Sequence, residues 1–221
     1  MNQYIKDLYP VKAQFCCGED IKLVIELENL SDADVGLQIT LVVSYLNRIE
    51  KDYNCGTTIL SPGEKKDLTV MIDPVCEEFR GFGADAYVYA CGSLVDTFSG
   101  AFDVVSDWRK TARYGFLSDF YKEDSGDRSD VESLCKLHIN HVQFYDWMYR
   151  SDELVAPSDD FTDLMGRRLN QKVVREKVKY CQDFGMKAIA YGAVYAASYD
   201  FFKSHEDWAL YESSGKALSF I

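Results

Sequence analysis

The spacing of the hydrophobic residues changes once along the chain, near residues 105–112, and divides the sequence into two halves of different type. From Val11 to Val104, short runs alternate apolar and polar residues between turn signals, as in Ile21 to Glu28. A period of two is typical of β-strands with one buried face. About seven such strands, with turn signals roughly every 8–12 residues, predict an immunoglobulin-like β-sandwich for residues 1–106.

The second half alternates predicted strands with predicted helices. Asn170 is placed to cap the second helix and Gly185 to end it. A long loop containing Pro157 is predicted before that helix, with Arg167 and Arg168 as a solvated pair in it. Successive βα units imply parallel strands with right-handed crossovers, as in a doubly wound sheet or a (β/α)8 barrel. The predicted strands cover residues 114–119, 142–147 and 186–191, and the helices 128–137 and 170–184.

The length of the second half limits the barrel interpretation. A complete (β/α)8 (TIM) barrel needs about 250 residues, which is more than the 221 residues of the whole chain. The dinucleotide-binding alternative is not supported, because the turn after the first strand, Asp119 to Lys122, lacks the glycine-rich phosphate-binding pattern. Residues 107–221 are therefore predicted to be the N-terminal part of an incomplete barrel.

Composition excludes several kinds of partner. The chain has 24 Lys and Arg against 36 Asp and Glu, a formal net charge of −12. Such a charge repels phosphate backbones and anionic membranes, so neither a nucleic acid nor a membrane partner is expected. No run approaches the roughly 20 apolar residues of a membrane span, and the N-terminus lacks the pattern of a secretory signal. We expect a cytoplasmic protein, or a secreted one if a signal has been removed.

Cysteine and histidine give no sign of a metal centre. None of the seven cysteines forms a Cys-x-x-Cys pair, and buried free thiols are favoured over disulfides, for example at Cys91 and Cys181 within apolar segments. The three histidines, His138, His141 and His205, lack the convergent spacing of metal ligands. Neither a metal nor a cofactor is predicted.

Polar and aromatic residues gather where the predicted strands of the second half end. Ligands of α/β barrels bind at the carboxyl ends of the strands. Sugar rings stack on Trp and Tyr, and carboxylates accept hydrogen bonds from sugar hydroxyls, so the pattern is typical of a carbohydrate cleft. An equally weighted alternative is that Asp119 and Asp146 cap neighbouring helices and that the aromatic residues fill the barrel rim. The candidate residues are Asp119, Tyr145, Asp146, Trp147, Tyr149 and Tyr195.

Several segments carry a resemblance to a known family over essentially the whole chain. The block Phe144-Tyr145-Asp146-Trp147 is the most specific of them. The other matching segments are Tyr114 to Phe120, His138 to Arg150, Tyr180 to Ala197 with its Phe184-Gly185-Met186-Lys187-Ala188 core, His205 to Leu210, and the sandwich ending in Ala101-Phe102-Asp103-Val104. Together these segments resemble glycoside hydrolase family 66, which contains the endodextranases and the cycloisomaltooligosaccharide glucanotransferases.

The resemblance implies an enzyme that acts on α-1,6-glucan (dextran) with retention of configuration. One carboxylate then attacks the anomeric carbon and another protonates the leaving oxygen, the two lying about 5–5.5 Å apart. In the family both groups lie on later barrel strands, which would fall beyond Ile221. No catalytic residue is therefore assigned, and the chain alone is expected to be inactive. The six candidate residues are expected to bind glucose units of an α-glucan or an isomaltooligosaccharide.

Two alternatives to the enzyme interpretation remain open. The first is a non-catalytic module that binds glucan or a partner, and the second is a truncated gene product. A half barrel exposes strand edges and apolar faces, so self-association is expected in either case.

Overall fold

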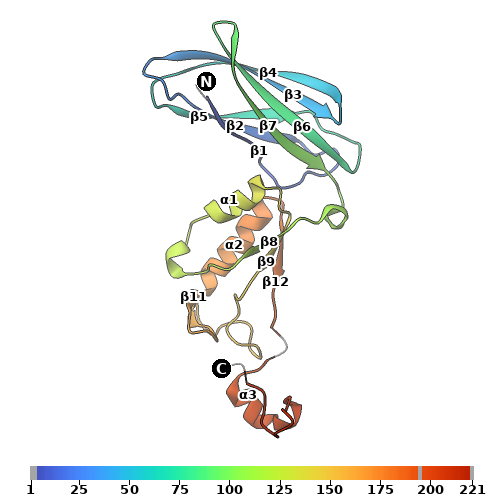
Figure 1. The fold of residues 1–221 in the computed structure, drawn as a ribbon, viewed down its shortest axis with the longest axis vertical. Coiled ribbons are helices and arrows are strands. Elements are labelled where there is room, and N and C mark those ends of the chain that lie inside the picture. The colour runs from blue at the N-terminus through green and yellow to red at the C-terminus, as the bar shows by residue number, and fades with distance from the viewer. Residues whose placement is uncertain (1–3, 194–195, 220–221) are drawn as a thin grey trace. The chain divides into compact units, whose positions relative to one another are not determined.

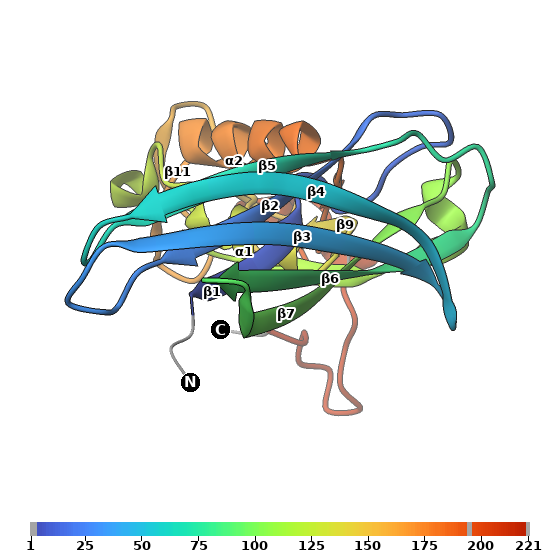
Figure 2. The ribbon, with the colours of Figure 1, turned by 90° about the horizontal axis from the view of Figure 1, so that it is seen from above.

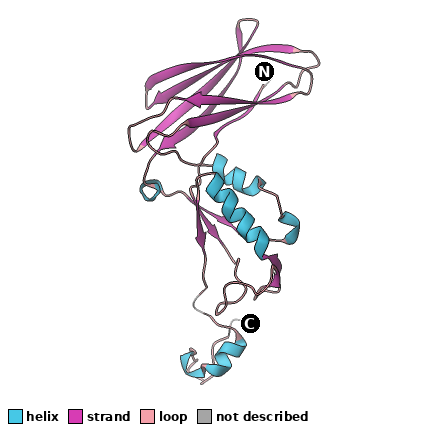
Figure 3. Cartoon of the chain, turned by 180° about the vertical axis from the view of Figure 1, so that it is seen from behind, coloured by secondary structure: helices cyan, strands magenta, loops and turns pink. Residues whose placement is uncertain are grey.

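A computed structural model describes residues 4–193 and 196–219, in which strands predominate over helices (Figures 1 and 3). The contacts divide the chain into two compact units. The first contains the chain up to Gly115 together with residues 128–142 and 180–187, and the second contains residues 116–127, 143–179 and 188 onward. This division interleaves the units along the sequence, and the predicted domain boundary at residue 106 stays a prediction.

Seven antiparallel strands in two sheets make up most of the first unit (Figure 2). The three-stranded sheet has the order β1-β2-β5 and the four-stranded sheet the order β4-β3-β6-β7. Strands β6 and β7 form a hairpin around Gly92, in which Ala90 faces Ser93. The strands are β1 (Ile5–Pro10), β2 (Ile21–Glu28), β3 (Val35–Tyr45), β4 (Arg48–Leu60), β5 (Lys65–Ile72), β6 (Arg80–Ala90) and β7 (Ser93–Val104).

The core of this unit is built from every second residue of its strands. In β2 the side chains of Ile21, Leu23, Ile25 and Leu27 are at most 2% exposed, as the period of two predicts. Leu37, Ile39, Leu41 and Val43 of β3 are buried in the same cluster. Since residues of one parity share one face of a strand, the two sheets bury these faces against a common core.

Strand β4 was missed by the sequence reasoning. It is an edge strand whose side chains are almost all exposed or half-buried, so it lacks the clear alternation of β2. Its pairing with β3 is interrupted by register shifts between Ile39 and Thr40 and between Val43 and Ser44. Such irregularities mark β-bulges, which twist a strand and disturb its hydrogen-bonding edge.

A second kind of sheet follows, with the order β12-β9-β8. Arg113 O accepts a hydrogen bond from His141 N (3.0 Å), and Leu117 O accepts one from Tyr145 N (2.7 Å), so β8 and β9 run parallel. Three such strands do not close a barrel, and the TIM-barrel prediction is not confirmed within the described residues. The strands are β8 (Tyr114–Leu117), β9 (His141–Phe144) and β12 (Lys187–Ala190), each shorter than predicted.

Helices connect these strands in sequence, as predicted. Helix α1 (Ser129–Lys136) lies between β8 and β9, and α2 (Gln171–Asp183) lies between β9 and β12. The Asn170 cap is confirmed, because its Oδ1 accepts hydrogen bonds from Lys172 N (2.9 Å) and Val173 N (3.2 Å). The short elements are the 3-10 helices η1 (Trp108–Thr111), η2 (Lys122–Asp124) and η3 (Glu206–Trp208), and helix α3 (Tyr199–Ser204).

The long loop predicted before α2 contains a hairpin. Strands β10 (Asp160–Thr162) and β11 (Arg168–Asn170) pair antiparallel, with Phe161 opposite Leu169. Both of these apolar side chains are buried, at 8% and 2% exposure. A pure loop was therefore the wrong interpretation, because strands of three residues are too short to show a period.

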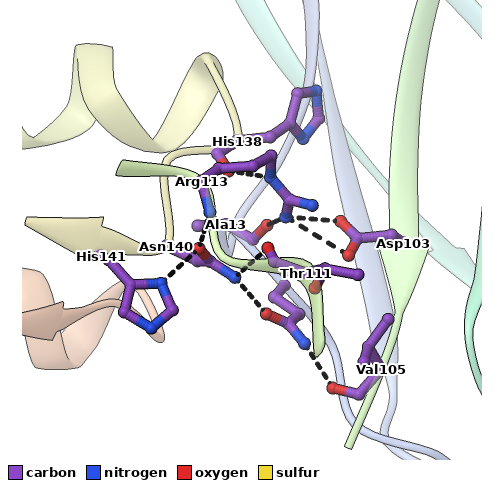
Figure 4. Close-up of polar contacts among 9 residues, drawn as sticks. Ala13, Asp103, Val105, Thr111, Arg113, His138, Asn140 and His141 are labelled. Atoms are coloured by element: carbon purple, nitrogen blue, oxygen red, sulfur yellow. Dashed lines mark hydrogen bonds and ion pairs between the residues drawn. The ribbon is translucent and has the colours of Figure 1, made fainter. Parts of the chain in front are cut away.

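A buried amide joins several segments of the first unit (Figure 4). The side chain of Asn140 is 1% exposed and donates to Gln14 Oε1 (2.6 Å) and to Thr111 O (3.1 Å). Its Oδ1 accepts from Arg113 N (2.8 Å) and lies 2.7 Å from Nδ1 of His141. Both the oxygen and the nitrogen of the Asn140 amide thus have hydrogen-bond partners. The neighbouring His141 is buried, and this burial lowers its pKa.

Arg113 extends this network. Its Nη2 lies 3.0 Å from Asp103 Oδ1 and donates to Ala13 O (3.2 Å), and its Nε donates to His138 O (Figure 4). Burial raises the pKa of Asp103 and lowers that of His138, and the positive charge of Arg113 opposes the first shift. These histidine contacts agree with structural roles.

The thiols divide between interior and surface. All seven cysteines are free, and Cys135 and Cys181 are buried. The expectation of a buried thiol was wrong for Cys91, which is exposed at the β6–β7 turn with a φ of 49°. Within residues 4–193 and 196–219, no group of three or more His, Cys, Asp or Glu side chains is arranged to bind a metal ion. In the same ranges, no helix has the length and apolarity required to cross a membrane.

Gly100 of β7 provides a test of the packing. A Cβ at this position would meet Leu8 O at 2.6 Å and Leu8 Cγ at 2.9 Å, whereas a Cβ at Gly36 of β3 would meet nothing within 4 Å. We expect Gly100→Ala to lower the free energy of unfolding by about 1–3 kcal/mol through overpacking, and Gly36→Ala to change it by less than about 0.5 kcal/mol. Urea unfolding of both variants checks this. Equal stabilities would contradict the close approach of β7 to Leu8.

Candidate functional site

The carboxyl ends of β8, β9 and β12 lie in the second unit. Tyr145 N donates to Leu117 O (2.7 Å) and Tyr191 N donates to Phe144 O (3.3 Å), so the chain remains paired as it leaves each strand. Because parallel strands share one carboxyl edge, the residues that follow them are brought to the same edge of the sheet. This edge is where the sequence predicted a ligand site.

An aromatic group surrounds Tyr145, whose side chain is 40% exposed. Its ring centroid lies 4.8 Å from that of Tyr191 and 6.2 Å from that of Phe116, the latter in an edge-to-face arrangement. Phe116 is itself exposed. Tyr191 and Phe116 were not among the predicted site residues, although both belong to the predicted strands and an alternation of side chains could have placed them. The arrangement leaves aromatic surface open to stacking.

The indole nitrogen of Trp147 makes a hydrogen bond within the protein. The half-buried indole donates from Nε1 to Tyr191 O (2.9 Å), which links the segment after β9 to the segment after β12. Its N–H is therefore used within the protein, so a ligand can meet only the ring. We conclude that Trp147 holds the carboxyl edge in place.

Asp146 forms part of an ion-pair network with the β10–β11 hairpin. Arg167 Nη2 lies 3.5 Å from Asp146 Oδ2 and donates to Asp146 O (3.1 Å). The backbone of Asp146 adopts a left-handed φ of 52°, which turns the chain sharply after β9. The interpretation of Arg167 and Arg168 as a solvated pair was wrong for Arg167, whose side chain is 26% exposed, while Arg168 is exposed.

Asp163 is the buried anchor of this network. Its side chain is 4% exposed, and its carboxylate lies 2.7 Å from Nε and 2.6 Å from Nη2 of Arg167. It also accepts from the backbone N–H of Met165 (2.9 Å) and of Arg167 (2.8 Å). Sequence reasoning missed Asp163. The signal was present, because Asp163 and Gly166, which has a φ of 81°, are residues of a hairpin turn.

Asp119 differs from Asp146 in having no partner. It is exposed, and in the described parts of the chain its carboxylate makes no hydrogen bond or ion pair. Neither aspartate caps a helix, because Tyr121 precedes η2 and Asp146 is held by Arg167. The helix-capping alternative is therefore wrong for both. Asp119 is free to accept hydrogen bonds from a ligand.

Tyr149 and Tyr195 complete the predicted set. The ring of Tyr149 contacts Phe161 edge-to-face at 6.0 Å, and the guanidinium of Arg150 lies 4.1 Å from its centroid. Tyr149 is therefore packed between the hairpin and a cation, which leaves less of it for a ligand than of Tyr145. Tyr195 lies outside the described residues.

The loop that follows β9 is tied to the start of α3. Ser198 donates to Asp152 from its backbone N (3.1 Å) and from its hydroxyl (2.9 Å), and it also caps α3 by accepting from Phe201 N (3.3 Å). Burial opposes ionisation of Asp152, but the hydrogen bonds from Ser198 outweigh it and lower the pKa of this carboxyl. The segments around the carboxyl edge are thus fixed to one another by ionic and hydrogen-bonded contacts.

Comparison with known protein families identifies the family of the chain. Glycosyl hydrolase family 66 matches residues 10–220, and the chain belongs to this family of carbohydrate-active enzymes. Two cycloisomaltooligosaccharide glucanotransferases of Niallia circulans are each 26% identical to it, over 227 and 224 residues. These alignments cover 98% and 94% of this chain but 23% and 22% of the two relatives, so the chain spans less than a quarter of their length.

A solved structure shows the same fold. It is the cycloisomaltooligosaccharide glucanotransferase of Paenibacillus sp. in complex with cycloisomaltoheptaose, which matches with a TM-score of 0.84 and 22% sequence identity. The match covers 96% of this chain and 31% of that chain. The arrangement of the described elements is thus that of one part of a larger protein of this family.

The Arg167 network gives a test of how the site is held. We expect Arg167→Ala to lower the free energy of unfolding by about 1–3 kcal/mol, because the buried Asp163 carboxylate loses its charged partner. Arg168→Ala removes the neighbouring exposed arginine and should change stability by less than about 0.5 kcal/mol. Chemical denaturation measures both. A cost for Arg168→Ala as large as that for Arg167→Ala would contradict the assignment.

Proposed function

We propose that the chain is the N-terminal part of an α-1,6-glucan-active enzyme and that the carboxyl edge of β8, β9 and β12 binds glucose units. The observation that carries the proposal is an exposed Tyr145 ring, backed by Tyr191, on the same sheet edge as the unpartnered carboxylate of Asp119. Sugars offer an apolar ring face for stacking and hydroxyl groups for hydrogen bonding. The edge provides partners for both.

The family supports the choice of substrate class. Both glucanotransferase relatives are named for cycloisomaltooligosaccharides, and the Paenibacillus sp. enzyme was solved with cycloisomaltoheptaose. We extend that substrate class to this chain. Hydrolysis of dextran and transfer to cyclic products share the same donor sugar, so the proposed binding role holds for either reaction.

Each site residue has a separate role in the proposal. Tyr145 offers a stacking surface, Asp119 accepts hydroxyl hydrogen bonds, and Asp146 is oriented by Arg167 at a fixed turn. Trp147 ties the edge together through Tyr191 O, and Tyr149 packs against Phe161 of the hairpin. Tyr195 completes the set as predicted from the sequence.

Bond cleavage is assigned to residues outside this chain. A retaining mechanism requires a nucleophilic carboxylate and an acid/base carboxylate about 5–5.5 Å apart across the scissile bond. Of the two aspartates of the edge, Asp146 is engaged by Arg167, and among residues 4–193 and 196–219 no side chain or backbone group orients Asp119. We propose that both catalytic carboxylates lie beyond residue 221, so that residues 1–221 bind glucan without cleaving it.

The same proposal includes the architecture of the whole enzyme. The strand orders β1-β2-β5 and β4-β3-β6-β7 suit an immunoglobulin-like sandwich for residues 1–106. The parallel order β12-β9-β8, with α1 and α2 as connections, suits the first units of a (β/α)8 barrel for residues 107–221. In the isolated chain, the edges of β8 and β12 are then available for self-association.

Binding is the first test. We expect the 221-residue chain to bind linear isomaltooligosaccharides in isothermal titration calorimetry, and Tyr145→Ala and Asp119→Asn each to weaken binding about three- to tenfold. Tyr87→Ala, which removes a tyrosine from β6 of the first unit, serves as the matched control and should bind like the parent. Maltooligosaccharides of equal length test whether the site prefers the α-1,6 linkage, and we expect them to bind more weakly. Unchanged affinity in both site variants would refute the assignment of the edge.

Turnover is the second test. The purified chain is incubated with dextran, and reducing ends and product sizes are followed by chromatography. We expect no release of oligosaccharides, because a glycosidic bond is cleaved only when both carboxylates are present. Oligosaccharide release that disappears in Asp119→Asn would place a catalytic group inside this chain and overturn the proposal.

A further inference from the structure

Two exposed cysteines meet in the first unit. Cys17 follows β1 along the chain, and Cys76 lies between β5 and β6. The two segments are joined by their backbones, since Gly18 N donates to Val75 O at 2.8 Å. The Cys17 thiol donates to Cys76 O at 3.0 Å, so its sulfur lies against the backbone of Cys76 itself.

The surroundings of the Cys17 thiol, Cys76 among them, shift its pKa. Desolvation, followed by the neighbouring Cys76 and Glu78, raises the pKa of Cys17. Cys17 is further positioned from the other side, because its backbone N donates to Ser106 Oγ at 3.1 Å.

The remaining cysteines lack this arrangement. Cys135 and Cys181 are buried, so an external disulfide cannot reach their thiols. The thiol of the half-buried Cys55 donates to Tyr53 O at 3.5 Å. Cys91 is exposed at the β6–β7 turn. Cys16 is exposed beside Cys17 but makes no hydrogen bond to Cys76 in the described part of the chain.

We propose that Cys17 and Cys76 are a site of reversible disulfide formation within the chain. The co-reactant is a small-molecule disulfide such as oxidised glutathione. The thiolate of Cys17 attacks one glutathione sulfur, which forms a mixed disulfide and releases a glutathione thiolate. The thiolate of Cys76 then attacks the Cys17 sulfur and releases the second glutathione thiolate. The two cysteines lose two electrons and two protons, and the glutathione disulfide is reduced by two electrons.

The crosslink would enclose much of the first unit. Cys17 and Cys76 are 59 positions apart, and strands β2 to β5 lie between them. A crosslink over so long a loop stabilises chiefly by restricting the unfolded chain. It would add a covalent link between the segment after β1 and the β5–β6 connection, which a backbone hydrogen bond and a thiol contact already join.

The test uses the 221-residue chain and oxidised glutathione at mildly alkaline pH. We expect non-reducing peptide mapping to find a Cys17–Cys76 linkage, with the linked peptides together two hydrogens lighter than their reduced forms. The melting temperature should rise by roughly 5 °C or more, and a reductant should reverse the rise. Cys17→Ser and Cys76→Ser should each abolish the linkage and leave a glutathione adduct on the remaining thiol.

Two further variants decide between the pairings. Cys91→Ser, at an exposed turn away from the pair in sequence, should behave like the parent. Cys16→Ser should retain the linkage, since Cys16 is not a partner. Loss of the linkage in Cys16→Ser, a crosslink between two chains, or no Cys17–Cys76 linkage in the parent would each overturn the proposal.

Discussion

Burial of the Asn140 side chain imposes a constraint on the parallel sheet. An unsatisfied buried amide costs about 1–3 kcal/mol, so its donors and acceptor require fixed partners. The side chain meets Thr111 O and Arg113 N just before β8, and its own backbone O accepts from Lys187 N (2.8 Å) at the start of β12. One residue therefore aligns the amino ends of three strands.

This alignment matters because the strands are so short. Each of β8, β9 and β12 has four residues, so a shift of one position at the amino end would exchange the side chains on the two faces. The residues that leave the carboxyl ends would move with it. The polar cluster at one end of the sheet thus determines which residues, Tyr145 among them, follow the strands at the other end.

The sequence predicted those parts of the fold that follow from a local repeat. The alternation in β2 and the cap at Asn170 depend on residues within one element, and both were found as predicted. Strand β4 was missed because an edge strand with both faces largely solvated has no hydrophobic period to detect. Cys91 was misplaced because its segment is apolar, whereas its exposure depends on a turn with positive φ.

The candidate site shows the same limit. Strand ends could be located, so Tyr145 and Asp146 were named from the sequence. The charge network of Asp146, Arg167 and Asp163 could not be located in the same way. Arg167 and Asp163 belong to a hairpin whose strands have three residues each, and such strands are too short to show a period. Pairing between distant segments is decided by tertiary contacts, and a single sequence records these only when they leave a local signature.

The irregular edge of β4 has a consequence for how the protein behaves in crowded solution. Open strand edges invite addition of strands from other molecules, which leads to aggregates. Here the edge carries two interruptions in register and the charged residues Arg48, Glu50 and Lys51. An incoming strand would meet misaligned hydrogen-bonding groups and would have to bury charges. The longest strand among the described residues is thereby protected against edge-to-edge pairing with other molecules.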